Sequence, residues 1–206
     1  MKSNVSAGAF SGRRVFLRAA FCLGLLGAIL GPLPCLAAQE APAAARPLIV
    51  YFSQSGNTQK VAEDIQQIVG GDLLRIETEK PYPSDYDTLV KLAREEQKSG
   101  ARPAIKTGIP DFAPYSVIFI GYPNWWSGLP MPVFTFLEKA KISGKPVAPF
   151  DTHGGGGLGH SIEELKTLLP GCNILKPLAI SGKMAGSEAA RAEVREWLEG
   201  MGLARP

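Results

Sequence analysis

Three short stretches of the chain combine residue types that could together hold a flat, negatively charged ligand. Residues 53–58 read Ser-Gln-Ser-Gly-Asn-Thr, residues 122–128 contain two adjacent tryptophans, and residues 151–157 contain four successive glycines. Hydroxyl and backbone N–H groups suit a phosphate, whereas indole rings suit a planar aromatic group. The three stretches therefore predict one composite binding site if the fold brings them together.

The first stretch is the one best suited to an anion. Residues 53–58 directly precede a helical pattern, where free backbone N–H groups and the helix dipole favour negative charge. The stretch lacks the lysine of a Walker loop and the spacing of the dinucleotide glycine motif, so a terminal monophosphate fits better than a triphosphate or a nicotinamide cofactor. The alternative is simple helix capping, which accounts for one or two of the six residues.

The second stretch places Trp125 and Trp126 in a loop with glycine and prolines close by. Two adjacent indoles are a poor choice for a purely solvated turn, and a flat aromatic ligand would explain them. The alternative is that one or both rings fold back into the core, because indole carries a large apolar area. We expect at least one ring to line the pocket.

The third stretch contains glycines at 154–157, which have too little side chain to pack or to catalyse. Glycine there permits close approach of the backbone to a planar group or a positive φ, whereas the alternative is a flexible surface loop. His153 could relay a proton or could merely fix the loop, and His160 carries less signal. We assign no catalytic residue and no metal site.

Five apolar runs at 48–52, 73–76, 117–120, 147–150 and 174–180 predict strands, and helical stripes alternate with them. The second helix, within residues 81–100, has Tyr86, Leu89, Val90 and Ala93 on one face. This alternation predicts an α/β fold with a parallel sheet covered on both faces. In such a sheet ligands bind beyond the carboxyl ends of the strands, where the three stretches lie.

Two prolines conflict with this assignment of strands. Pro149 lies inside the fourth strand, where a central ladder would lose a donor, and Pro177 lies in the fifth. The second proline is tolerable if the fifth strand is at an edge of the sheet.

The first 38 residues differ from the rest. They contain four basic residues, no acidic residue and an uncharged apolar stretch at 19–38 that ends in alanines. This is the pattern of a cleaved signal peptide, and residues 11–18, with paired arginines, resemble the twin-arginine export signal. We expect a signal peptide at 1–38, a linker at 39–46 and a single domain at 47–203, exported to the periplasm without a stable membrane span after cleavage. The alternative is an uncleaved anchor or a lipoprotein on Cys35.

The charge balance and the cysteine content argue against nucleic-acid binding and against an internal disulfide. Removing the four signal cations from the 22 basic residues leaves 18 against 19 acidic ones, so nucleic-acid binding lacks an electrostatic basis. Outside residues 1–38 the only cysteine is Cys172, which cannot form an internal disulfide and reads as a small apolar residue.

These three loops together resemble the cofactor loops of flavodoxin-like proteins, over nearly all of residues 47–203. The segments at 81–86, 102–103 and 131–133 are similar to those of one bacterial flavodoxin subfamily, and the second and third loops are also similar to those of flavin-dependent quinone reductases. The resemblance implies a doubly wound five-stranded parallel sheet of order 2-1-3-4-5, helices on both faces, and bound flavin mononucleotide (FMN). It implies that FMN contacts Ser53, Gln54 (through its backbone), Ser55, Gly56, Asn57, Thr58, Pro123, Asn124, Trp125, Trp126, Thr152, His153, Gly154, Gly155 and Gly156.

Three functions remain open at this point. The first is an electron carrier in which FMN exchanges electrons with a redox partner protein. The second is an FMN-dependent NAD(P)H or quinone oxidoreductase with a small quinone-like acceptor. Export favours the carrier, because free nicotinamide cofactor is not expected outside the cytoplasm. The third is a flavin-free binding module that uses the same anion pocket.

Overall fold

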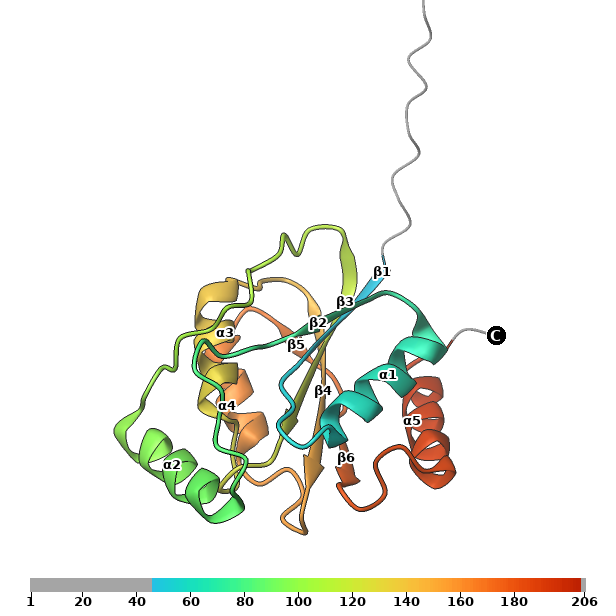
Figure 1. The fold of residues 1–206 in the computed structure, drawn as a ribbon. Coiled ribbons are helices and arrows are strands. Elements are labelled where there is room, and N and C mark those ends of the chain that lie inside the picture. Colours follow the sequence, from blue (N-terminus) through green and yellow to red (C-terminus); the bar gives the residue numbers. More distant parts are fainter. Residues whose placement is uncertain (1–45, 205–206) are drawn as a thin grey trace, which may run out of the picture. The chain divides into compact units, whose positions relative to one another are not determined.

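The computed structural model describes residues 46–204, which form a parallel sheet with helices on both faces (Figure 1). The strands lie in the order β2-β1-β3-β4-β5, and β6 also pairs with β4. The predicted fold class and strand order are confirmed. The strands are β1 (Arg46–Tyr51), β2 (Asp72–Arg75), β3 (Tyr115–Pro123), β4 (Pro146–His153), β5 (Asn173–Ile174) and β6 (Leu178–Ser181).

The predicted fifth strand is divided into two pieces on one edge. β5 pairs with the start of β4 and β6 with its end, so the chain between them, which contains Pro177, leaves the ladder. Leu175 N–H donates to the carbonyl of Val147 at 2.8 Å, so the backbone N–H and carbonyl groups of Val147 point toward this edge. Alternate residues of a strand face the same neighbour, so the nitrogen of Pro149 also faces this edge, opposite the gap. Both prolines are thereby accommodated without losing a central hydrogen bond.

The helices cover the sheet in two layers (Figure 1). Helices α1 and α5 pack on one face, and α3 and α4 pack on the other, while α2 lies apart from the sheet. The bounds are α1 (Asn57–Val69), α2 (Tyr86–Ser99), α3 (Met131–Ala140), α4 (Ser161–Leu168) and α5 (Glu188–Gly200).

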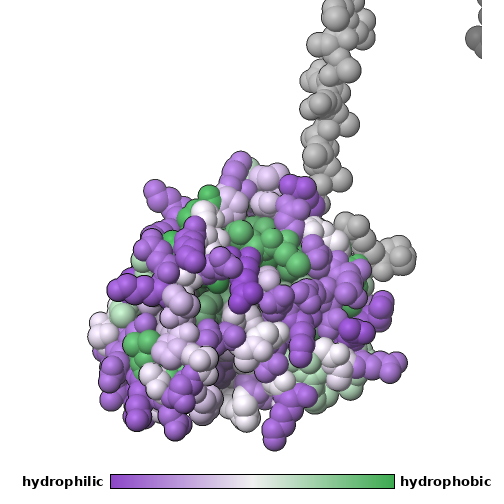
Figure 2. Space-filling model, viewed as in Figure 1, coloured by the Kyte–Doolittle hydropathy of each residue, from purple (hydrophilic) through white to green (hydrophobic). Residues whose placement is uncertain are grey.

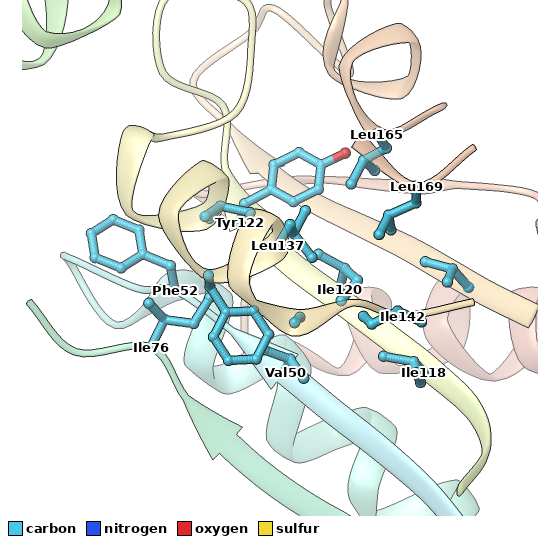
Figure 3. Close-up of a cluster of buried hydrophobic side chains, with 14 of the residues drawn as sticks. Val50, Phe52, Ile76, Ile118, Ile120, Tyr122, Leu137, Ile142, Leu165 and Leu169 are labelled. Carbon is cyan, nitrogen blue, oxygen red and sulfur yellow. The ribbon is translucent and has the colours of Figure 1, made fainter. Parts of the chain in front are cut away.

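Each face of the sheet has its own hydrophobic core. Ile49, Phe119 and Phe150 point toward α1 and α5, where Trp197 and Leu198 of α5 cover them. The other core lies under α3 and α4 (Figure 3) and includes Val50, Ile118, Ile120, Leu137 and Leu165. Because β1, β3 and β4 are buried on both faces, their carboxyl ends are rigid platforms for the loops that follow.

Helix α2 departs from the usual arrangement of a surface helix. Asp85 caps its start by accepting a hydrogen bond from Thr88 N–H at 2.9 Å, and Gly100 ends it at φ 63°. Of its residues only Ala93 is buried, and Tyr86 is 74% exposed. The apolar stripe predicted on this helix therefore does not cover the sheet.

The predicted signal peptide and linker lie outside the described residues, apart from Arg46, which begins β1. Among residues 46–204, no helix is both long and apolar enough to cross a bilayer. The face drawn in Figure 2 is largely hydrophilic, with hydrophobic side chains confined to separate patches.

Candidate functional site

A cavity of about 490 Å³ opens at the carboxyl ends of the strands, where the three predicted loops converge. Its wall also includes one face of α2 and the turn after β6. The lining residues are Ser55, Asn57, Tyr86, Leu89, Val90, Ala93, Pro123, Asn124, Trp125, Trp126, Thr152, His153, Gly154, Gly182 and Lys183.

The loop before α1 leaves the start of that helix open to a ligand. The N-cap is Gly56, at φ 86°, which has no side chain to make a capping hydrogen bond, so neither Asn57 nor Thr58 is the N-cap. Gln59 N–H donates to Ser53 Oγ at a long 3.3 Å. Among residues 46–204 the N–H groups of Asn57 and Thr58 at the start of the helix have no side-chain partner, so the arrangement favours an anion cradle over simple capping.

Hydrogen bonds tie the loops together. Thr58 Oγ1 and Thr152 Oγ1 lie 2.8 Å apart, which joins the start of α1 to the end of β4. Asn124 N–H donates to the carbonyl of Thr152 at 2.9 Å, and the Asn124 side-chain amide donates to the carbonyl of Gly157. The first, second and third loops are thus held as one unit.

Trp126 occupies a strained position in a tight turn. Trp125 and Gly128 exchange two backbone hydrogen bonds of 3.1 Å, and between them Trp126 and Ser127 have φ values of 52° and 65°. A bulky residue at positive φ is unusual and often marks a functional site. The Trp126 indole N–H donates to the carbonyl of Val90 at 3.0 Å, which fastens α2 to this turn.

Trp125 belongs both to the cavity wall and to the core. Its ring meets those of Phe52 and Tyr82 edge to face, with centroids 5.4 and 5.1 Å away. The Tyr82 hydroxyl donates to Glu96 Oε2 at 2.6 Å, and burial raises the pKa of Tyr82. Both indoles line the cavity, and the aromatic cluster gives Trp125 a fixed orientation there.

His153 holds its own loop. Its Nδ1 accepts a hydrogen bond of 3.0 Å from Gly155 N–H, which leaves the ring proton on Nε2 in the neutral form. His160 lies outside the cavity wall and pairs with Glu164 at 3.2 Å, and Glu164 in turn accepts from Leu129 N–H at 2.8 Å. His160 and Glu164 therefore support the Trp turn from α4.

Several predicted site residues lie away from this cavity wall. Ser53, only 3% exposed, and Gln54 line a smaller cavity of about 230 Å³ that also contains Arg75. Gly56, Thr58, Gly155 and Gly156 are absent from the wall of the larger cavity. Thr58 acts instead through its bond to Thr152, and Gly56 through its backbone conformation.

The structure adds wall residues that the sequence did not predict. Leu89, Val90 and Ala93 of α2 form an apolar side of the cavity. Gly182 and Lys183 come from the turn after β6, and Gly182 N–H donates to the carbonyl of His153 at 2.8 Å. The glycine-lysine pair directly after the last strand was the available sequence signal for this turn.

Asp151 is a buried carboxyl group beneath the third loop. Its side chain is fully buried, and neither oxygen has a hydrogen-bond partner among residues 46–204. Burial raises the pKa of Asp151 to about 7. Its cross-strand neighbour Tyr122 shares a hydrogen bond of 2.9 Å with Ser161, and burial raises the pKa of the tyrosine too.

The described residues offer no cluster of three or more histidine, cysteine or acidic side chains that could hold a metal ion. Cys172, partly buried, has its thiol 3.5 Å from the carbonyl of Ile142.

The cavity fits an organic ligand with a phosphate end and a flat ring. Uncapped N–H groups and hydroxyls line one part of it, and indoles and apolar side chains line another. Gly154 adds room, because a Cβ there would meet no protein atom within 4 Å.

Comparisons with known proteins agree with this geometry. A family model described as flavodoxin matches residues 46–201. A candidate flavoprotein from Bacteroides eggerthii is 33% identical over 77% of this chain and 98% of its own, with a TM-score of 0.66. A flavoprotein from Lactobacillus acidophilus, solved in complex with FMN, is 26% identical over 75% of this chain and 99% of its own, with a TM-score of 0.60. Flavodoxin 2 from Bacillus cereus shares the fold, at 21% identity over 77% and 98% of the two chains and a TM-score of 0.50. No curated protein matches the chain.

Proposed function

Because this chain belongs to the flavodoxin family and is an FMN-binding flavoprotein, we propose that it is an exported electron carrier that works with a redox partner protein. Bound FMN supplies the chemistry of accepting and donating one or two electrons. The polypeptide supplies position, a partly water-excluding wall and electrostatics.

The observation that supports this function most strongly is the convergence of three loops on one cavity. The bonds from Thr58 to Thr152 and from Asn124 to Thr152 join them at the carboxyl ends of β1, β3 and β4. Strands β1 and β3 flank the switch point of this doubly wound sheet, and β4 lies beside β3, so the loops meet where ligands of such folds bind. A cavity of about 490 Å³ is in the range of small-molecule sites.

The wall residues divide by the part of FMN that they would hold. Ser55, Asn57 and the N–H groups of the first turn of α1 would hold the phosphate, with Thr58 and Gly56 shaping the turn. Trp125 and Trp126 would lie along the ring system. The backbone of residues 152–154 would meet its edge, because glycine at 154 leaves the approach open.

The ionisable groups of the wall favour a carrier over an enzyme. Of the described residues, only Tyr86, His153 and Lys183 on this wall can carry or exchange a charge. The Nδ1 lone pair of His153 accepts a hydrogen bond from Gly155 N–H, so this ring has a structural role in the loop. Electron exchange requires no general acid or base, whereas many reductions of small substrates do.

Export is part of the proposal and rests on residues 1–38. A twin-arginine signal suits a protein that binds its cofactor in the cytoplasm and leaves already folded. We assign the mature protein to the periplasm, where nicotinamide cofactors are not expected to be free and electrons would arrive from another protein.

A second candidate, an FMN-dependent reductase of a small quinone-like acceptor, is favoured by α2. Leu89, Val90 and Ala93 form an apolar side of the cavity that could receive a flat apolar molecule beside the flavin. Outside the cytoplasm such a reductase would need an electron donor other than free NAD(P)H.

Purified protein tests the proposal directly. We expect a yellow protein that releases one FMN per chain on denaturation, identified by mass spectrometry, and that oxidises NAD(P)H slowly with a quinone present. Stepwise reduction should give two separate one-electron potentials. Rapid NAD(P)H-dependent quinone reduction would establish the second candidate, and a colourless protein that ignores added FMN would leave only a flavin-free binding module.

A further inference from the structure

Lys183 stands next to the part of the cavity assigned to the phosphate. It lies in the turn that follows β6 and lines the cavity. The preceding residue, Gly182, approaches the first loop so closely that a Cβ built on it would lie 2.9 Å from Asn57 Nδ2. Gly182 is held there by its N–H bond to the carbonyl of His153. The turn carrying Lys183 therefore adjoins Asn57.

Lys183 is also the one wall residue with a permanent charge within residues 46–204. None of the ion pairs formed in this part of the chain includes it, so its ammonium group has no carboxylate partner there. Lys60 on α1 packs against Gly186, near the end of the segment between β6 and α5: a Cβ built on Gly186 would lie 2.9 Å from Lys60 Cδ. Lys60 does not line the cavity. The wall thus contains one available cation beside a helix start that favours anions.

A phosphate monoester carries close to two negative charges at neutral pH. The backbone N–H groups and hydroxyls of the first loop can donate hydrogen bonds, but they carry no full charge to balance it. A lysine ammonium is a compact charge on a flexible stem with three donors, so it can reach a phosphate oxygen from an adjoining turn.

We propose that Lys183 contacts the phosphate of FMN and makes the site selective for phosphorylated flavin over riboflavin. The inference rests on the proposed assignment of the first loop to the phosphate. In this proposal the turn after β6 neutralises the negative charge of the phosphate, which the three cofactor loops cannot do.

The experiment compares two ligands and four proteins. Apoprotein of the wild type, Lys183→Met, Lys183→Arg and Lys166→Met is titrated with FMN and, separately, with riboflavin, and flavin fluorescence reports binding. Lys166 is an exposed lysine on α4 away from the cavity, so its variant controls for loss of one surface charge. Thermal unfolding of each apoprotein checks that the fold is unchanged.

We expect Lys183→Met to raise the Kd for FMN roughly tenfold and to leave the Kd for riboflavin within about twofold. The Lys183→Arg variant should retain most of the FMN affinity, and Lys166→Met all of it. The FMN affinity of the wild type should fall with added salt more steeply than that of Lys183→Met, because one charge pair is screened.

Two results would overturn the inference without contradicting the proposal that the wild-type protein binds FMN. An equal loss of affinity for both flavins would place Lys183 at the ring, and unchanged FMN affinity would remove it from the site. A wild-type protein that binds neither flavin would instead refute the proposed function, and this inference with it.

Discussion

Thr58 and Thr152 are 94 residues apart in the chain, yet their hydroxyl oxygens lie 2.8 Å apart and both side chains are buried. One residue belongs to the first turn of α1, and the other to the end of β4. The bond therefore sets the distance between the loop assigned to the phosphate and the loop assigned to the ring edge. Its removal should affect both stability and cofactor binding.

Thr152→Val tests this bond. The substitution keeps the shape but leaves the Thr58 hydroxyl buried without its partner, so we expect the free energy of unfolding to fall by about 1–2 kcal/mol. The double variant Thr58→Val with Thr152→Val should lose less than the sum of the single variants, because both hydroxyls are then gone. Urea unfolding of the apoproteins measures both values. Strictly additive losses would mean that the bond contributes nothing.

Gly56→Ala separates backbone strain from ligand contact. Gly56 has φ 86° and Gly100, the C-cap of α2, has φ 63°, and a Cβ at either position meets nothing within 4 Å. Alanine in the left-handed region costs about 1–2 kcal/mol, so both variants should lose similar stability. Only Gly56→Ala should weaken FMN binding in equilibrium dialysis. Equal affinity loss in Gly100→Ala would show that general destabilisation, not the anion cradle, controls binding.

Gly154→Val tests whether the cofactor requires an absent side chain. Gly154 lines the cavity, its φ lies outside the left-handed region, and a Cβ there meets no protein atom. The apoprotein should thus keep its thermal stability, while the Kd for FMN rises by roughly tenfold or more as the side chain enters the ligand's space. Gly156→Ala, in the same loop but off the wall, serves as the control. Unchanged FMN affinity in Gly154→Val would contradict the assignment of this loop.

Asp151 should make stability fall as pH rises through the weakly acidic range. Its pKa is about 7 in the folded protein against an ordinary 3.8, so between these values the folded chain holds a proton that the unfolded chain has lost. The group then lowers the free energy of unfolding by up to about 1.4 kcal/mol per pH unit as pH rises. The contribution of the proton is complete below pH 3.8 and is lost above pH 7.

Asp151→Asn isolates that effect, because asparagine does not titrate and the other titratable groups, including the neighbouring Tyr122, are common to both proteins. The stability of the variant relative to the wild type should rise steadily from about pH 4 to pH 7 in urea unfolding. A difference that stays constant over this range would show that the carboxyl group is ionised throughout and is stabilised in some other way.

Much of the architecture was predictable from local pattern. Buried strands such as 48–52 and 117–120 are continuous apolar runs, and loops rich in hydroxyls, indoles or glycines follow three of them. Parallel topology then requires these loops to share one edge. The convergence of the three loops followed from strand order alone, without any side-chain detail.

The parts that were not predicted depend on tertiary contacts. The stripe of Leu89, Val90 and Ala93 has the same spacing whether it faces a sheet or a cavity, so the pattern could not tell which. The glycine before Lys183 indicates a turn after the last strand, but the place of Lys183 on the cavity wall depends on how closely Gly182 approaches Asn57. The division of the fifth strand could not be predicted because it depends on the pairing register, which places Pro149 opposite the gap between β5 and β6 that contains Pro177.

That divided edge also bears on how the protein behaves at high concentration. An uninterrupted outer strand offers a row of unpaired backbone groups on which a second chain can extend the sheet. Here one edge consists of a two-residue and a four-residue piece, and the opposite edge, β2, has four residues. Neither side offers a long template, so the folded domain is protected against the strand-to-strand association that begins fibrous aggregation.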